Sequence, residues 1–198
     1  MPITLNGSSG VVTPGATVGS ITGILKATSG VVSQAIIGTD YSDLTLATAQ
    51  TASGTAVDFT GIPSWAKRVT VIFDGVSLSG TSVFLIQIGD SGGIETTGYN
   101  SVGIQSTISA GVGGGTSTSG FVFGSSINSA SNVFGGIFML STLNSGTTWA
   151  GFGGFSGGDR LLTSAGSKTL SADIDRIRIT TVNGTDTFDA GTINISYE

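Results

Sequence analysis

The sequence predicts an all-β protein: a β-sandwich or jelly-roll-like domain preceded by an extended N-terminal arm. Several segments alternate apolar and polar residues with a period of two, which is the pattern of a half-buried strand. No window shows three or four turns of apolar residues at helical spacing. Glycine accounts for 33 of the 198 residues, and each glycine costs about 1 kcal/mol in a helix relative to alanine.

Residues 1–45 are predicted to form the arm, and residues 46–198 the sandwich domain. Pairs of aliphatic residues recur in the arm between Gly and Ser, and each pair is too short to form a strand with a buried face by itself. Three arms wound together, or one arm laid on a partner, could bury these pairs. A disordered tail is the alternative, although disordered segments usually have more charges and fewer apolar residues. The candidate contact residues are Val11, Val12, Ile24, Leu25, Val31, Val32, Ile36 and Ile37.

Four further segments are predicted to be strands. Residues 67–74 alternate polar and apolar residues, and residues 83–88 are rich in β-forming residues and precede a Gly-rich turn. Residues 132–140 are apolar on both faces, as expected for an inner strand. Residues 148–155 place large aromatic residues between glycines. The apolar face of the first of these strands would carry Val69, Val71 and Phe73.

The last two strands have the clearest alternation. Residues 175–182 should turn Ile177 and Ile179 inward, and residues 192–197 repeat the pattern. The intervening Asn183-Gly184 favours a turn, because this dipeptide tolerates positive φ. By contrast, residues 109–120 contain little to bury and are predicted to form an exposed, mobile loop. Such a loop could approach a ligand or serve as a passive connector.

The composition excludes several classes of function. The chain has no His and no Cys, so the usual neutral-pH base, the thiolate nucleophile, disulfides and Cys-ligated zinc are all missing. The seven Lys and Arg residues are scattered and the net charge is −5, which argues against nucleic-acid binding. No apolar run is long enough to insert into a membrane, and residues 1–4 lack a basic signal region. No cofactor or metal is expected.

Carboxylates are the remaining acid–base candidates, in the pairs Asp90 and Glu95, Asp173 and Asp175, and Asp186 and Asp189. A glycosidase needs two carboxyl groups about 5–10 Å apart, one with a raised pKa. Spacing in the sequence cannot show this arrangement, and Asp is common in turns for conformational reasons. Residues 90–95 also lack the twelve-residue pattern of a calcium loop. No catalytic residue is therefore predicted.

Aromatic residues suggest a binding surface instead. Tyr99 and Trp149, with nearby aromatic residues, could present apolar rings to a sugar. The competing interpretation places these rings in the core, where aromatic side chains are more often found. Tyr99 and Trp149 are the candidate receptor contacts.

Two stretches resemble parts of known proteins. FTGIPSWAKRVTVIFDGVS (residues 59–77), followed by LIQIG (85–89) and closed by AGTINISYE (190–198), is similar to a terminal β-domain in structural proteins of tailed bacteriophages. GILKATSGVVSQAIIGTDY (residues 23–41) resembles a linker found ahead of many phage fibre domains. The resemblance covers roughly residues 58–198 together with the linker, and it is weakest between residues 109 and 169.

The resemblance implies a non-enzymatic virion protein that assembles as a homotrimer in the bacterial cytoplasm. A tail-fibre-type protein would dock on the particle through its arm and display the β-domain for attachment to a host glycan or protein. The alternative is a head-fibre or capsid decoration protein, seated on the shell and stabilising it. A surface-polysaccharide depolymerase is a third reading. The expected partners are further copies of the chain and other tail or capsid proteins, without nucleic acid or membrane insertion.

Overall fold

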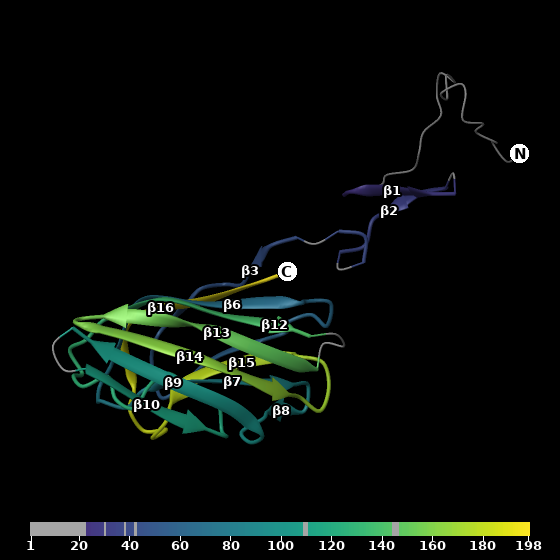
Figure 1. Ribbon diagram of the computed structural model, residues 1–198. Coiled ribbons are helices and arrows are strands. Elements are labelled where there is room, and N and C mark those ends of the chain that lie inside the picture. Colours follow the sequence, from purple (N-terminus) through teal and green to yellow (C-terminus); the bar gives the residue numbers. More distant parts are fainter. Residues whose placement is uncertain (1–22, 30, 38, 42, 109–110, 144–146) are drawn as a thin grey trace, which may run out of the picture. The chain divides into compact units, whose positions relative to one another are not determined.

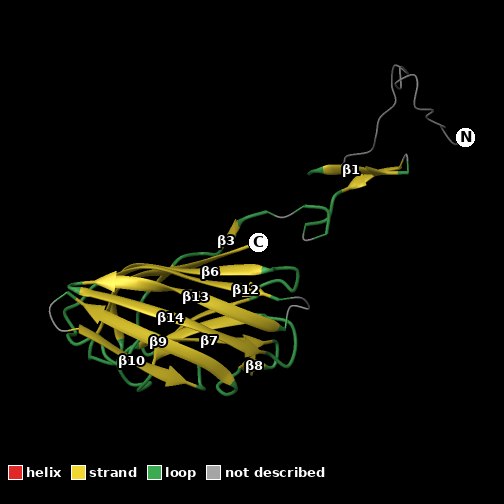
Figure 2. Cartoon of the chain, in the orientation of Figure 1, coloured by secondary structure: helices red, strands yellow, loops and turns green. Residues whose placement is uncertain are grey.

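The computed structural model describes residues 23–29, 31–37, 39–41, 43–108, 111–143 and 147–198 (Figure 1). The chain divides into two units, Met1–Asp43 and Leu44–Glu198, whereas the sequence prediction places the boundary two residues later. The described part of the chain contains strands and loops without any helix (Figure 2). It therefore offers no helix that is long and apolar enough for a membrane span.

The described part of the first unit contains a small hairpin. Strands β1 (Leu25–Thr28) and β2 (Val31–Gln34) pair antiparallel, from Leu25 opposite Gln34 to Thr28 opposite Val31. Asp40 accepts hydrogen bonds from the Lys26 ammonium, at 2.9 Å, and from the Ile36 amide, at 2.7 Å. The Ile36 amide and the Lys26 side chain hold the pKa of the Asp40 carboxyl below its usual value.

The second unit is a two-layer antiparallel β-sandwich, which confirms the predicted fold class. Among the described residues, nine strands form the larger sheet and five the smaller one. The larger sheet has the spatial order β10 (Gly111–Ser117), β9 (Tyr99–Thr107), β14 (Arg160–Thr169), β13 (Thr148–Gly157), β12 (Phe134–Thr142), β6 (Arg68–Leu78), β16 (Phe188–Tyr197) and β3 (Thr45–Leu46), with β4 (Gln50–Thr51) also paired to β16. The smaller sheet has the order β11 (Phe121–Val122), β7 (Phe84–Asp90), β15 (Arg176–Thr181) and β5 (Val57–Thr60), with β8 (Gly93–Ile94) also paired to β7.

The two sheets share one apolar core. Alternation in β6 and β15 turns one face of each strand inward, and the predicted inward residues Val69, Val71 and Phe73, and Ile177 and Ile179, are all buried. Aromatic rings fill the space between the layers. Phe73 stacks on Phe155 with ring centroids 4.0 Å apart, and Phe84 meets Phe73 edge-on at 5.1 Å.

The prediction of an exposed, mobile loop at residues 109–120 was wrong for residues 111–117. Residues 111–117 form β10, the edge strand of the larger sheet, paired from Gly111 opposite Thr107 to Ser117 opposite Ser101. Main-chain hydrogen bonds to β9 make this strand, so it needs no apolar side chains of its own. A Cβ on Gly114 would lie 2.7 Å from the Gly103 carbonyl oxygen, so glycine permits the close pairing. Residues 109 and 110 lie outside the described residues.

Strand β12 lies inside the sheet as predicted, between β6 and β13, but only one of its apolar faces is covered. Phe134, Phe138 and Leu140 are buried, whereas Ile137 and Met139 are exposed. The expectation of burial on both faces was wrong because the sandwich has only two layers. One face of β12 packs toward the smaller sheet, and no described segment covers Ile137 and Met139 on the other face.

Candidate functional site

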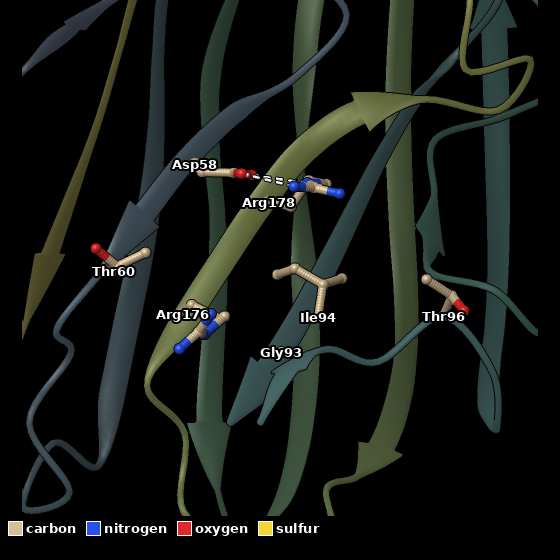
Figure 3. A pocket seen from close by; sticks show the side chains of 7 residues that line it. All are labelled: Asp58, Thr60, Gly93, Ile94, Thr96, Arg176 and Arg178. Carbon is tan, nitrogen blue, oxygen red and sulfur yellow. Dashed lines mark hydrogen bonds and ion pairs between the residues drawn. The ribbon is translucent and has the colours of Figure 1, made fainter. Parts of the chain in front are cut away.

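A hollow of about 350 Å³ lies on the outer face of the smaller sheet (Figure 3). This volume is near the lower end of the range for small-molecule sites. Strands β5 and β15 supply one wall, and β8 with the residue after Glu95 supplies the other. The lining residues are Asp58, Thr60, Gly93, Ile94, Thr96, Arg176 and Arg178.

Strand alternation places the charged side chains of the hollow. In β5, Val57 and Phe59 are buried, so Asp58 between them faces outward. In β15, Ile177 and Ile179 are buried, so Arg176 and Arg178 take the outward positions. The register of the two strands then sets Arg178 opposite Asp58.

Arg178 and Asp58 form a bidentate ion pair. The Arg178 Nε donates to Asp58 Oδ1 at 2.8 Å, and its Nη2 donates to Oδ2 at 2.7 Å (Figure 3). The Asp58 carboxylate raises the pKa of Arg178 despite the opposing effect of partial burial. Arg178 is therefore a fixed cation that cannot act as a base.

Arg176 is also held by a carboxylate. Its Nη2 donates to Asp175 Oδ2 at 2.7 Å and to the Ser91 carbonyl oxygen at 3.3 Å. The second contact ties β15 to the turn that precedes β8. Each guanidinium in the hollow is thus charge-balanced by a neighbouring aspartate.

This arrangement offers charged and polar groups that a ligand could contact. The seven lining residues include two guanidinium groups, two threonine hydroxyls and one carboxylate, Asp58, which accepts hydrogen bonds from Arg178 through both of its oxygens. Because both arginines already have carboxylate partners, an anion would have to compete with Asp58 and Asp175 for them. Hydroxyl or amide groups of an uncharged ligand could instead add to the remaining donors and acceptors.

The predicted carboxylate pair Asp90 and Glu95 does come together, but in a structural network. The Ser171 Oγ lies 2.6 Å from Asp90 Oδ2 and 2.8 Å from Glu95 Oε1, and the Ser171 amide donates to Glu95 at 2.7 Å. Hydrogen bonds from Ser171 and from the Gly92 amide hold the pKa of Asp90 below its usual value. Burial acts to raise the pKa of Glu95, but hydrogen bonds from Lys168 and Ser171 outweigh it, and this pKa is also lowered.

Lys168 and Tyr99 complete this network. The Lys168 ammonium pairs with Glu95, donates to the Thr169 carbonyl oxygen at 2.8 Å, and lies 5.5 Å from the centre of the Tyr99 ring. The Tyr99 hydroxyl donates to the Glu95 carbonyl oxygen at 2.9 Å and accepts from the Ile88 amide at 2.7 Å. Burial raises the pKa of the Tyr99 phenol. The network links β7, β9 and β14 at one end of the sandwich.

The prediction that Tyr99 and Trp149 contact a receptor was wrong, because both side chains are buried. Tyr99 is 3% exposed and Trp149 is fully buried. Both rings point into the core from the inner face of the larger sheet, so neither can present a platform to a sugar. The competing interpretation of these aromatic residues, as core, is the one that holds.

The predicted arm contacts occupy several environments. Ile24, Leu25, Val32 and Ile36 are exposed, each by about half of its surface, and Ile37 is half-buried. Val31 begins β2. Val11 and Val12 lie outside the described residues.

Sequence reasoning missed the hollow around Asp58 and Arg178. The local signal was present, because each of these charged residues stands between two apolar residues in a strand. The pairing could not be read from the sequence, since the two residues are 120 positions apart.

The described residues contain no group of three or more acidic side chains placed to hold a metal ion. The chain matches no protein-family model, no curated protein and no solved structure.

Proposed function

We propose that this chain is a non-enzymatic structural protein of a tailed bacteriophage virion. In this proposal it is a homotrimeric tail-fibre-type protein, anchored through residues 1–45, whose β-sandwich is displayed for host attachment. The resemblance of residues 23–41 and 58–198 to phage fibre proteins supports the proposal. The observation that carries it lies in the β1–β2 hairpin and the residues that flank it, where the aliphatic side chains of Ile24, Leu25, Val32 and Ile36 are exposed.

These side chains favour a contact with a partner. Ile24, Leu25, Val32 and Ile36 are each about half exposed. Fully burying one such side chain is worth about 1.5–3 kcal/mol, so covering the exposed half of all four would contribute about 3–6 kcal/mol per chain. Hydrogen bonds already join β1 to β2, so docking this segment does not have to meet the whole entropic cost of ordering it.

The carboxylate geometry argues against a depolymerase. A glycosidase needs one carboxylic acid with a raised pKa to protonate the leaving group. Asp90 and Glu95, which share the Ser171 hydroxyl, both have lowered pKa values. Their oxygens are engaged by Ser171 and Lys168.

Deletion of residues 1–45 tests the anchoring role. The truncated protein should fold, as judged by circular dichroism and cooperative unfolding, and should be absent from phage particles purified from cells that express it. Truncated protein on particles at the normal copy number would contradict the proposal. Particles that carry the full-length chain distinguish the two virion positions, because a capsid decoration protein would be present in tens to hundreds of copies and a tail fibre in far fewer.

The hollow is the candidate receptor contact in place of Tyr99 and Trp149. Arg176→Ala removes a donor from the hollow without touching the core, so we expect about tenfold weaker binding to host cells. Lys67→Ala, an exposed cation outside the hollow, is the matched control and should bind as the unaltered protein does. Equal binding by all three proteins would exclude the hollow from attachment.

A further inference from the structure

Seven large apolar side chains are exposed on one face of the larger sheet. They lie on β12, β13, β14, β9 and β10, which are neighbours in the sheet (Figure 2). We call the outward side of these five strands the apolar face. Its large side chains are Ile137, Met139, Phe152, Leu161, Val102, Ile104 and Val112.

The strand register shows that these side chains share one face. Met139 is opposite Phe152, Phe152 is opposite Ala165, and Ala165 is opposite Val102, which makes one continuous row across four strands. Directly opposite residues in an antiparallel sheet point to the same side. A parallel row runs from Ile137 through Gly154 and Thr163 to Ile104.

No charged side chain interrupts the apolar face. The five strands contain two charged residues, Arg160 and Lys168, and both are buried on the opposite, inner side. An antiparallel sheet with one solvated face normally alternates apolar inward and polar outward residues. The smaller sheet follows this rule, with Asp58, Arg176 and Arg178 on its outer face. The apolar face departs from the rule at its seven large apolar side chains, and large exposed apolar patches mark interaction sites.

The apolar face is large enough for a stable contact. Five strands about 4.8 Å apart span about 24 Å, and three rows of outward residues spaced about 6.7 Å span about 20 Å. The resulting footprint is about 500 Å², and it includes outward polar residues such as Thr163 and Ser106 between the seven large apolar side chains. Three such faces around a three-fold axis would together cover about 1,500 Å², comparable with the total area of a standard specific interface.

Charge and shape favour a second copy of the chain as the occupant. Each copy carries a net charge of −5, so a contact through an uncharged surface avoids placing like charges of two copies directly against each other. Phe152, 67% exposed, stands next to the small residues Gly154 and Ala165. A face that carries both a protruding ring and a shallow area can accept the ring of another copy.

We infer that the apolar face is the contact between the bodies of the oligomer, and that in a trimer the face of each copy meets the faces of both neighbours around the three-fold axis. This inference rests on the proposed function only for the expectation that the chain self-associates.

Sedimentation velocity and native mass spectrometry of the full chain test this inference. Phe152→Glu would bury an unpaired carboxylate in the contact, so the oligomer should dissociate with a dissociation constant raised about a hundredfold or more. Thr60→Glu, on the outer face of the smaller sheet, is the matched control and should remain oligomeric. Circular dichroism and urea unfolding establish that both variants fold.

Cross-linking gives a second test that does not depend on a disruptive charge. Because the chain has no cysteine, any cross-link between single introduced cysteines must join two copies. A short bis-maleimide reagent should link Phe152→Cys chains covalently and should not link Thr60→Cys chains; this reagent, unlike a disulfide, does not require the two Cα atoms to lie within about 7 Å.

The outcomes separate this inference from the proposed function. A folded Phe152→Glu variant that stays oligomeric, with no cross-linking through Phe152→Cys, would overturn the inference. The proposal of a trimeric fibre protein would then still be supported by the exposed aliphatic side chains of the arm. An unaltered chain that is monomeric at tens of micromolar would overturn both the inference and the trimer. The particle experiment with the arm deletion would still decide separately whether the chain is a virion protein.

Discussion

Replacing Glu95 with Gln should destabilise the sandwich by removing the charge that balances a buried lysine. The Lys168 side chain is 6% exposed and the Glu95 side chain is 23% exposed. In the variant, the ammonium would retain the Thr169 carbonyl oxygen and the face of the Tyr99 ring. Neither group carries a negative charge.

The structure sets the size of this effect. Removing one partner of a buried ion pair costs about 3–5 kcal/mol, because the other charge stays buried and unpaired. Partial exposure of Glu95 and the two remaining contacts of Lys168 reduce this cost. We therefore expect a loss of about 2–3 kcal/mol at neutral pH. The matched control is Asp58→Asn, whose pair with Arg178 is 41% and 38% exposed and should be worth about 0–1 kcal/mol.

Urea unfolding as a function of pH provides the assay. The pKa of Glu95 in the folded chain lies below its ordinary value of 4.5. Its stabilising effect is therefore fully present above pH 4.5 and is lost as the pH falls through the folded-state pKa. The difference between the unaltered protein and Glu95→Gln should shrink as the carboxylate becomes protonated. A loss no greater than that of Asp58→Asn, or one that persists unchanged in acid, would refute this reasoning.

Two further substitutions test the packing of the sandwich by the same unfolding measurement. Trp149→Ala should lower the free energy of unfolding by about 3–5 kcal/mol because the ring is fully buried. Trp65 is only half-buried, so Trp65→Ala should lower it clearly less. Equal losses would contradict the core position of Trp149. Gly103→Ala would place a Cβ 2.1 Å from the Val122 carbonyl oxygen and should cost about 1–3 kcal/mol through overpacking. Gly184→Ala is the control: its Cβ would meet nothing within 4 Å, but the residue has a φ of +67°, so the free energy of unfolding should fall by about 1 kcal/mol. A smaller fall for Gly103→Ala than for Gly184→Ala would argue against the close approach of the two layers.

Local pattern accounts for the parts of the fold that the sequence predicted. Period-two alternation decides which residues of a strand share a face, and the inward positions of Val69 and Ile177 follow from it directly. The Asn183-Gly184 turn also follows from local conformational preference, and Gly184 has the expected positive φ. The predicted segments at residues 67–74, 175–182 and 192–197 correspond to β6, β15 and β16.

The candidate sites depended on contacts that local pattern does not contain. Alternation showed that Asp58 and Arg178 are outward residues, but the pairing of β5 with β15 was needed to join them into one hollow. Tyr99 and Trp149 had an open assignment in the sequence, because an aromatic residue fits either a core or a binding surface. Both side chains lie on the inner face of the larger sheet and are buried, so they belong to the core.

The amino-acid sequence by itself determined the class of structure, the two faces of its clearest strands and the shortage of reactive groups, since these depend on composition and neighbouring residues. The tertiary structure alone decided that the glycine-rich residues 111–117 are an edge strand, because β9 supplies their hydrogen bonds. It also decided which of the two apolar faces of β12 is buried. A strand's sequence sets what each face can bury, but the number of layers that stack around it sets what is covered.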